Sequence, residues 1–161
     1  MNAVDRSMEP RFCFIAAHVL NAIDAALSPA RRRRVEGIAY LLGRTDGLRT
    51  CLLACMSVDA RATRGSFHVT AKEMVRVVNL ANELGLQVAG QVHTHPLEAF
   101  HSEGDDAGAQ IRFDGYVSIV LPDYGRHLPS LSGAAAFMYS TRSNAFIPIP
   151  FDAKKVIQPS L

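Results

Sequence analysis

Residues 86–96 read LQVAGQVHTHP, and this stretch decides the fold. From Leu86 to Val92, apolar residues or glycine occupy every second position, a period of two that predicts a β-strand. Side chains two residues apart on extended backbone point to the same face, so His93 and His95 leave the strand on one side while Thr94 points to the other. The sequence therefore predicts two neighbouring imidazoles at the edge of a sheet.

Two such imidazoles can belong to a catalytic zinc site. A catalytic zinc ion takes three protein ligands and keeps its fourth position for water. Pro96 begins a turn, and Asp105, a few residues beyond it, can supply the third ligand as a carboxylate oxygen. We expect one Zn²⁺ ion bound by His93, His95 and Asp105.

Glu36 and Ser102 would complete a site for amide hydrolysis. Zinc lowers the pKa of its bound water to about 7, yet the water still needs a general base. Glu36 precedes an apolar run, residues 38–42, that is typical of a buried strand. Partial desolvation there raises the pKa of a carboxyl group toward the range of a general base. Ser102 can donate its hydroxyl to the oxyanion that forms when water attacks a carbonyl.

Together these residues resemble the JAMM (MPN+) metalloprotease family, whose pattern is a Glu, then His-Ser/Thr-His-Pro, then Ser-x-x-Asp. Three segments match in order: residues 36–43 as E-x-x-x-x-L-x-G, residues 93–96 as HTHP and residues 102–105 as S-x-x-D. The resemblance covers roughly residues 12–122. The loop between the second His and the Ser is one residue shorter than in the common form. Keeping the His–Asp distance would select Asp106 as the ligand, but we favour Asp105 because the Ser and the Asp open one turn and should move together.

The resemblance implies a fold, an activity and partners. The expected fold is α/β, a single MPN-like domain with a central mixed, mostly antiparallel β-sheet flanked by helices. The implied activity is that of a deubiquitinase-like zinc isopeptidase or peptidase, a hydrolase that cuts at the C-terminus of a ubiquitin-like protein. The partners would be that protein or its conjugates, with the activating and conjugating enzymes of the same pathway. Residues 99–102 and the pair Asp105-Asp106 are similar to bacterial members found in ubiquitin-like conjugation operons, including antiviral defence systems.

Other functions stay open at this point. A sulfur-carrier protein could be the substrate, or the chain could be a non-catalytic MPN scaffold, although such scaffolds typically lose the metal ligands. Ser102-x-x-Asp105 alone also fits a helix N-cap, and a single strand-end Glu is more often solvated. The chain lacks the P-C-x-x-C of nucleobase deaminases and the H-E-x-x-H of thermolysin-like proteases.

Composition limits the remaining classes. At 161 residues the chain can bury a core, and we expect one domain over residues 1–161 with flexible or peripheral ends at 1–10 and 152–161. A net charge of +2, from 17 basic and 15 acidic residues, gives no sign of a nucleic-acid partner. The three cysteines form no C-x-x-C pair and favour buried thiols in a reducing compartment. The apolar stretch 12–27 is too short and too interrupted to span a membrane, so we expect a cytoplasmic protein.

The remaining elements follow from periodicity and turn residues. In the first third of the chain we expect a helix over residues 12–27 that ends at Ser28-Pro29, although its first residues could instead form a strand, then a basic connector at 31–34 and a hairpin of the Glu36 strand and residues 50–58 around a turn at 45–47. A loop at 59–65, a short strand at 67–69 and a helix from a capping box at 70–73 to Gly85 should come next. After the histidines we expect a helix at 103–113, a strand at 116–121, a turn at 122–125, and strands at 134–139 and 145–149.

Overall fold

The computed structural model describes residues 10–100, 110–150 and 156–157. Its elements are, in chain order, β1 (Phe12–Ala16), α1 (Ala17–Arg33), β2 (Ile38–Thr45), β3 (Arg49–Ser57), β4 (Ala60–Ala62), β5 (Phe67–Val69), α2 (Ala71–Glu83), β6 (Gln87–Thr94), β7 (Val117–Leu121), the 3₁₀ turn η2 (Asp123–Gly125), β8 (Ala135–Ser140), β9 (Ala145–Ile149) and β10 (Val156–Ile157). Within these residues no helix is long and apolar enough to cross a membrane.

Eight of the described strands form one sheet in the order β10-β1-β3-β2-β6-β7-β8-β9. The sheet is mixed: β6 is antiparallel to β2 and parallel to β7, and β1 is parallel to both of its neighbours, β3 and β10. The other pairs, β2–β3, β7–β8 and β8–β9, are antiparallel. The expected α/β class with a mixed sheet is thereby confirmed. β4 and β5 form a separate two-stranded hairpin.

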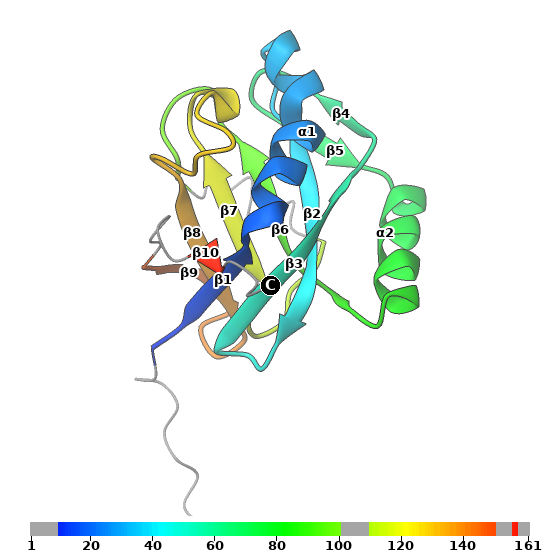
Figure 1. Cartoon of the computed structure of the whole chain (residues 1–161), viewed down its shortest axis with the longest axis vertical. Coiled ribbons are helices and arrows are strands. Elements are labelled where there is room, and N and C mark those ends of the chain that lie inside the picture. The colour runs from blue at the N-terminus through cyan, green and yellow to red at the C-terminus, as the bar shows by residue number, and fades with distance from the viewer. Residues whose placement is uncertain (1–9, 101–109, 151–155, 158–161) are drawn as a thin grey trace, which may run out of the picture.

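The helices cover different faces of this sheet. Along β2 the side chains alternate: Ala39 and Leu41 pack in one buried cluster with α1, whereas Tyr40 and Leu42 pack in a second cluster with α2. In Figure 1, α1 lies across the front of the sheet and α2 lies to its right. Val19, Ile23 and Leu27 recur at helical spacing on the buried face of α1, and Met74, Val77 and Ala81 do so on α2.

β6 departs at one point from the strict alternation that the sequence predicts. The pairing with β2 shifts between Leu41 and Leu42, because Leu41 faces Gly90 while Leu42 faces Val88. The extra residue of this β-bulge is Ala89. As a result Val88 joins the cluster beneath α2, whereas Ala89 packs in the cluster beneath α1.

The predicted end of the first helix is wrong. β1 does form over the first residues, but α1 continues through Pro29 to Arg33, so the expected basic connector is its last turn. Proline removes one backbone donor, which normally ends a helix. Here two contacts of Arg31 hold the following turn: it pairs with Asp24 of the same helix at 2.7 Å, and it donates to the distant carbonyl of Gly125 at 3.0 Å.

Three further predictions need correction. The expected loop at 59–65 contains β4, which is held by pairing with β5 and is too short to display a period. Residues 110–113 are not helical, and the rest of the expected 103–113 helix lies outside the described residues. The histidine strand does not lie at an edge of the sheet but near its centre, so the histidines stand at the end of a central strand. The hairpin of β2 and β3, helix α2 and strands β5, β7, β8 and β9 are confirmed.

Candidate active site

His93 and His95 emerge from β6 between two neighbouring strands. His93 pairs in register with Ile38 of β2 and with Val120 of β7, so its backbone is fixed on both sides. His95 lies just beyond the strand, where its amide donates to the carbonyl of Leu121 at 2.9 Å. Its own carbonyl accepts from the amide of Tyr124 at 2.8 Å. Both histidines are therefore held by backbone pairing rather than carried on a free loop.

The two imidazoles lie together, as the sequence predicts. Their ring centroids are 5.2 Å apart, and the rings are tilted by 51°. His93 is fully buried and His95 is only 5% exposed. Phe67 of β5 packs beside His93 with centroids 5.4 Å apart, and Phe100 packs edge-on to His95 at 4.8 Å. Aromatic side chains thus surround the pair.

Glu36 is brought to the same place by the start of β2. Its backbone amide donates to the carbonyl of Thr63 in the turn between β4 and β5, at 2.8 Å. The next residue, Gly37, exchanges two hydrogen bonds with Thr94, which lies between the two histidines and points to the opposite face as expected. Glu36 itself is only 5% exposed. A carboxylate and two imidazoles from distant parts of the sequence therefore meet in one buried region.

A cavity of about 460 Å³ opens beside Glu36 and His95. It is lined by Glu36, Ile38, Tyr40, Gly65, Ser66, Phe67, His68, Val69, Gln91, His95, Pro96, Leu97, Glu98, Phe100 and Gln110. Leu97 and Phe100 are large and exposed apolar side chains at this cavity. The space is large enough for a side chain and adjacent backbone of a bound chain.

The two histidines fit a shared metal ion. An imidazole nitrogen lies about 2.0–2.1 Å from zinc, so the ring centroids of two imidazoles on one ion lie within roughly 6–7 Å of each other. The observed separation of 5.2 Å meets this condition. Within the described residues, no group of three or more His, Cys, Asp or Glu side chains is arranged to hold a metal.

The remaining predicted site residues, Ser102 and Asp105, lie outside the described residues, as does the alternative ligand Asp106. The described residues on either side of this segment, Phe100 and Gln110, both line the cavity. Gln110 is held there by a hydrogen bond from its Nε2 to the carbonyl of Val69, at 2.9 Å. The segment thus leaves and rejoins the described part of the chain at the cavity wall.

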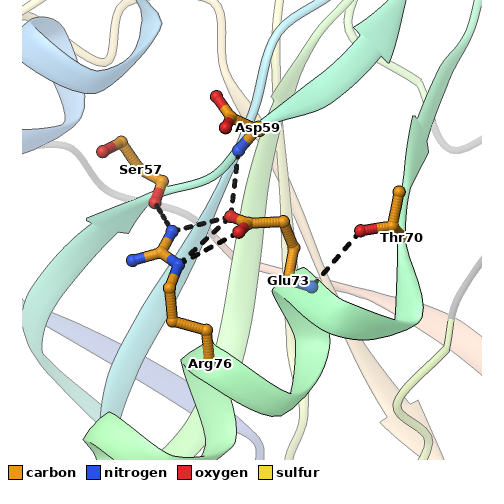
Figure 2. Close-up of polar contacts among 5 residues, drawn as sticks. All are labelled: Ser57, Asp59, Thr70, Glu73 and Arg76. Atoms are coloured by element: carbon orange, nitrogen blue, oxygen red, sulfur yellow. Dashed lines mark hydrogen bonds and ion pairs between the residues drawn. The ribbon is translucent and has the colours of Figure 1, made fainter.

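Figure 2 shows how the β4–β5 hairpin, which forms one wall of the cavity, is fastened to α2. Thr70 caps α2 by accepting a hydrogen bond from the amide of Glu73, which is half of the predicted capping box. The Glu73 carboxylate does not return to Thr70. It accepts from the amide of Asp59 at 3.1 Å and pairs with Arg76 at 2.7 Å. Arg76 also donates to the carbonyl of Ser57 at 2.9 Å, so the start of the hairpin is tied to the helix.

Sequence reasoning missed Gln91, which lines the cavity, and its buried partner Tyr116. Gln91 lies on β6 two positions before His93, and the hydroxyl of Tyr116 donates to its Oε1 at 3.1 Å. The signal in the sequence is an amide two positions before His93, on the same face of the predicted strand. The partnership with Tyr116 is visible only in three dimensions.

Comparisons with solved structures show the same fold in two bacterial proteins of low sequence identity. A protein from Desulfitobacterium hafniense is 16% identical, with a TM-score of 0.65 over 93% of this chain and 94% of its own. A protein from Salinibacter ruber is 22% identical, with a TM-score of 0.58 over 90% of each chain. No family model matches the sequence.

A curated relative carries the functional information. The protein named probable metalloprotease y4jG of Sinorhizobium fredii is 33% identical over 139 residues, which span 84% of this chain and 82% of the relative. Its name suggests a hydrolase and implies a metal. At this identity and coverage, the chain belongs to the metalloprotease family of which that protein is a member.

Proposed function

We propose that this protein is a JAMM-type zinc metallopeptidase that hydrolyses a peptide or isopeptide bond at the C-terminus of a ubiquitin-like protein. The observation that carries the proposal is the convergence of the buried residues Glu36 and His95 on one cavity, with the ring centroid of His93 5.2 Å from that of His95. These are the residues that the JAMM pattern assigns to metal binding and to acid–base chemistry. Glu36 lies just before β2, and the two histidines lie at the end of the neighbouring strand β6.

In this proposal His93, His95 and Asp105 hold one zinc ion. Zinc supplies a Lewis acid and a water of lowered pKa. The two imidazoles are suited to this because neutral nitrogen ligands are common on catalytic zinc. Ser102, the serine of the same Ser-x-x-Asp motif as Asp105, would donate its hydroxyl to the oxygen of the attacked carbonyl as negative charge develops there.

Glu36 has the role of general acid and base. It takes a proton from the attacking water and delivers it to the nitrogen of the leaving amine. Glu36 is only 5% exposed and lines the cavity beside His95. The hydrogen bond from its backbone amide to Thr63 fixes where the side chain begins. A buried, positioned carboxylate is what proton transfer to a defined atom requires.

The substrate class comes from the JAMM resemblance. A ubiquitin-like tail would enter along the cavity beside His95, and the activating and conjugating enzymes of the same pathway would be further partners, in a conjugation system of the antiviral type. Processing of a sulfur-carrier protein is the second candidate, since such a protein also ends in a flexible tail. A non-catalytic scaffold is disfavoured because Glu36 and both histidines are present together.

The test is cleavage of a panel of ubiquitin-like and sulfur-carrier proteins, each extended at its C-terminus by a short reporter domain. Each fusion is incubated with the zinc-loaded protein, with the chelated protein and with the Glu36→Gln variant, and product masses are measured. We expect a cut after the ubiquitin-like C-terminus that needs both zinc and Glu36. Cuts confined to sulfur-carrier fusions would select the second candidate, and a zinc-free protein that cuts none would favour the scaffold.

A further inference from the structure

Gln91 lies at the cavity with a buried amide. It is only 3% exposed, yet it lines the cavity beside His95. Because it stands two residues before His93 on β6, both side chains leave the same face of the strand. A buried amide needs partners for one acceptor and two donors, since an unsatisfied buried polar group is costly.

Tyr116 meets half of that requirement. It is completely buried, and its hydroxyl donates to Oε1 of Gln91 at 3.1 Å. Since Oε1 is the acceptor in this bond, the amide is turned so that Nε2 carries the two free hydrogens. Within the described residues the Gln91 side chain makes no further hydrogen bond. The donors of Nε2 are therefore left for whatever occupies the cavity.

Tyr40 adds a second polar group at the same level. It pairs in register with Gln91 across β2 and β6 and also lines the cavity. Burial raises the pKa of Tyr40 to about 12, so its hydroxyl keeps its proton at neutral pH. The other walls are largely apolar, with Ile38, Phe67 and Val69 among them. The cavity is thus apolar at the sides and carries neutral donors at its inner end.

The charges at the cavity act against an acidic occupant. Glu36 and Glu98 line it, and no Lys or Arg does so among the described residues. An acidic side chain would enter without a cationic partner and beside two carboxylates. A neutral apolar segment would bury its side chain on the walls and offer its backbone carbonyl oxygens to the donors.

We propose that the cavity binds an uncharged, apolar segment of the substrate's peptide chain, and that Gln91 donates from Nε2 to one of its carbonyl oxygens, with Tyr116 as the residue that orients the amide. This rests on the proposed function in taking the ligand to be a peptide and in placing the bond that is cut next to the proposed metal ligands. Residues two apart on a strand are about 6.6–6.8 Å apart, which is also the spacing of every second carbonyl of an extended peptide. Gln91 therefore donates its hydrogen bond to a carbonyl about two residues from the bond that is cut.

The test is a titration of the full chain with a blocked amino acid, N-acetyl-leucine methylamide, followed through the side-chain amide resonances of glutamine in ¹H–¹⁵N NMR spectra. We expect saturable shifts of the Gln91 Nε2 resonances. Gln87, at the exposed start of β6 with its Oε1 accepting from the Thr45 amide, is the internal control and should not move. N-acetyl-aspartate methylamide should bind at least ten-fold more weakly.

Two variants separate the role of Gln91 from stability. Tyr116→Phe keeps the Gln91 donors but frees the amide to turn, and we expect about five-fold weaker binding, the size of one ordinary hydrogen bond. The double variant Gln91→Met/Tyr116→Phe removes both partners of the buried bond and leaves neither unsatisfied, so it should fold and bind at least ten-fold more weakly.

Each outcome bears on the proposal. If the leucine probe shifts Leu97 and Phe100 but leaves Gln91 unmoved, or shifts none of them, the role of Gln91 is rejected. Equal binding of the two probes rejects the preference for an uncharged segment. The NMR titration needs neither zinc nor turnover, so the two proposals can fail separately. If the leucine probe shifts the Gln91 resonances but the protein shows no zinc-dependent cleavage, only the peptidase function is rejected. If the protein cleaves its substrate but the Gln91 resonances do not respond to the probe, only this inference is rejected.

Discussion

Gly37 and Thr94 bind each other through two hydrogen bonds. The amide of Gly37 donates to Oγ1 of Thr94 at 2.8 Å, and the amide of Thr94 donates to the carbonyl of Gly37 at 3.0 Å. One of these residues follows Glu36 and the other separates His93 from His95. The pair therefore fixes the proposed base relative to the proposed ligands, through a side chain that faces away from the cavity.

Thr94→Val should loosen this link. Valine keeps the shape of threonine but leaves the buried amide of Gly37 without its side-chain acceptor, a cost of about 1–3 kcal/mol in the free energy of unfolding. We expect a lower midpoint in urea unfolding and a fall in peptidase rate with metal still bound. Thr94→Ser restores the oxygen and is the matched control. A valine variant with unchanged stability would show that the hydrogen bond contributes nothing.

His93→Ala and His95→Ala should each lose zinc and activity, because only two protein ligands would remain. The measurement is zinc content of purified protein alongside the cleavage rate. His68 also lines the cavity but is exposed on β5, so His68→Ala is the control that should keep the metal. Removing a buried imidazole can itself weaken folding, so His93→Gln, which stays polar and nearly fills the space, is measured in parallel. Full zinc occupancy in both alanine variants would reject the assignment.

Much of the fold follows from short-range pattern. Alternation along β6, the turn at residues 45–47 and the helical spacing of α2 predict elements that the structure contains. The errors arise where distant contacts override local preference. Arg31 holds a helical turn beyond Pro29 partly through the carbonyl of Gly125, which is 94 residues away and leaves no mark on the local sequence pattern.

The candidate site was predictable only as a set of residue types. The order of Glu36, His93 and His95 in the sequence indicates which side chains should meet, and they do meet at one buried region. The inner end of the cavity was not predictable. It depends on the bulge at Ala89, which puts Val88 and Gln91 on one face against a strict period of two, and on the cross-strand contact with Tyr116.

The third ligand can be identified by a pair of substitutions. If the Ser and the Asp of the motif move together, Asp105→Ala should lose zinc while Asp106→Ala keeps it. The two variants remove the same chemical group from adjacent positions, so each is the control for the other. Zinc content by atomic absorption decides between them, and the reverse result would mean that the shortened loop shifts the ligand by one residue.

The contacts of Glu73 should control the β4–β5 wall of the cavity. Hydrogen bonds from Arg76, and then the amide of Asp59, hold the pKa of Glu73 below that of an ordinary glutamate. The contacts are therefore complete when the pH is above the ordinary pKa of a glutamate, and they are lost as the pH falls through the lowered pKa of Glu73. We expect Glu73→Gln to speed hydrogen exchange at Thr63, whose amide bonds to Ser66, with little change in global stability because such ion pairs near the surface contribute little.

Asp46→Asn is the matched control for Glu73→Gln. It removes a similar carboxylate, which accepts from the amides of Leu48 and Arg49 in the β2–β3 turn, away from the cavity. Exchange at Thr63 should not respond to it. If both variants speed exchange at Thr63 equally, the effect is a general loss of stability and not a local release of the hairpin.

Glu36→Gln separates the proposed base from the proposed ligands. Glutamine keeps the size and most of the polarity of Glu36 but cannot carry a proton between water and the leaving amine, so fold, zinc content and substrate binding should persist while turnover falls. General acid–base catalysis contributes roughly 10²–10⁴-fold, and we expect a loss at or above that range in single-turnover cleavage of the best fusion substrate. Glu98→Gln is the control, because Glu98 lines the same cavity but is exposed, and its variant should retain the rate to within a few-fold. Ser102→Ala should lie between them, about 10²–10³-fold slower with zinc retained. A Glu36→Gln protein that cleaves at nearly the normal rate would exclude Glu36 as the base even if both histidines prove to bind zinc.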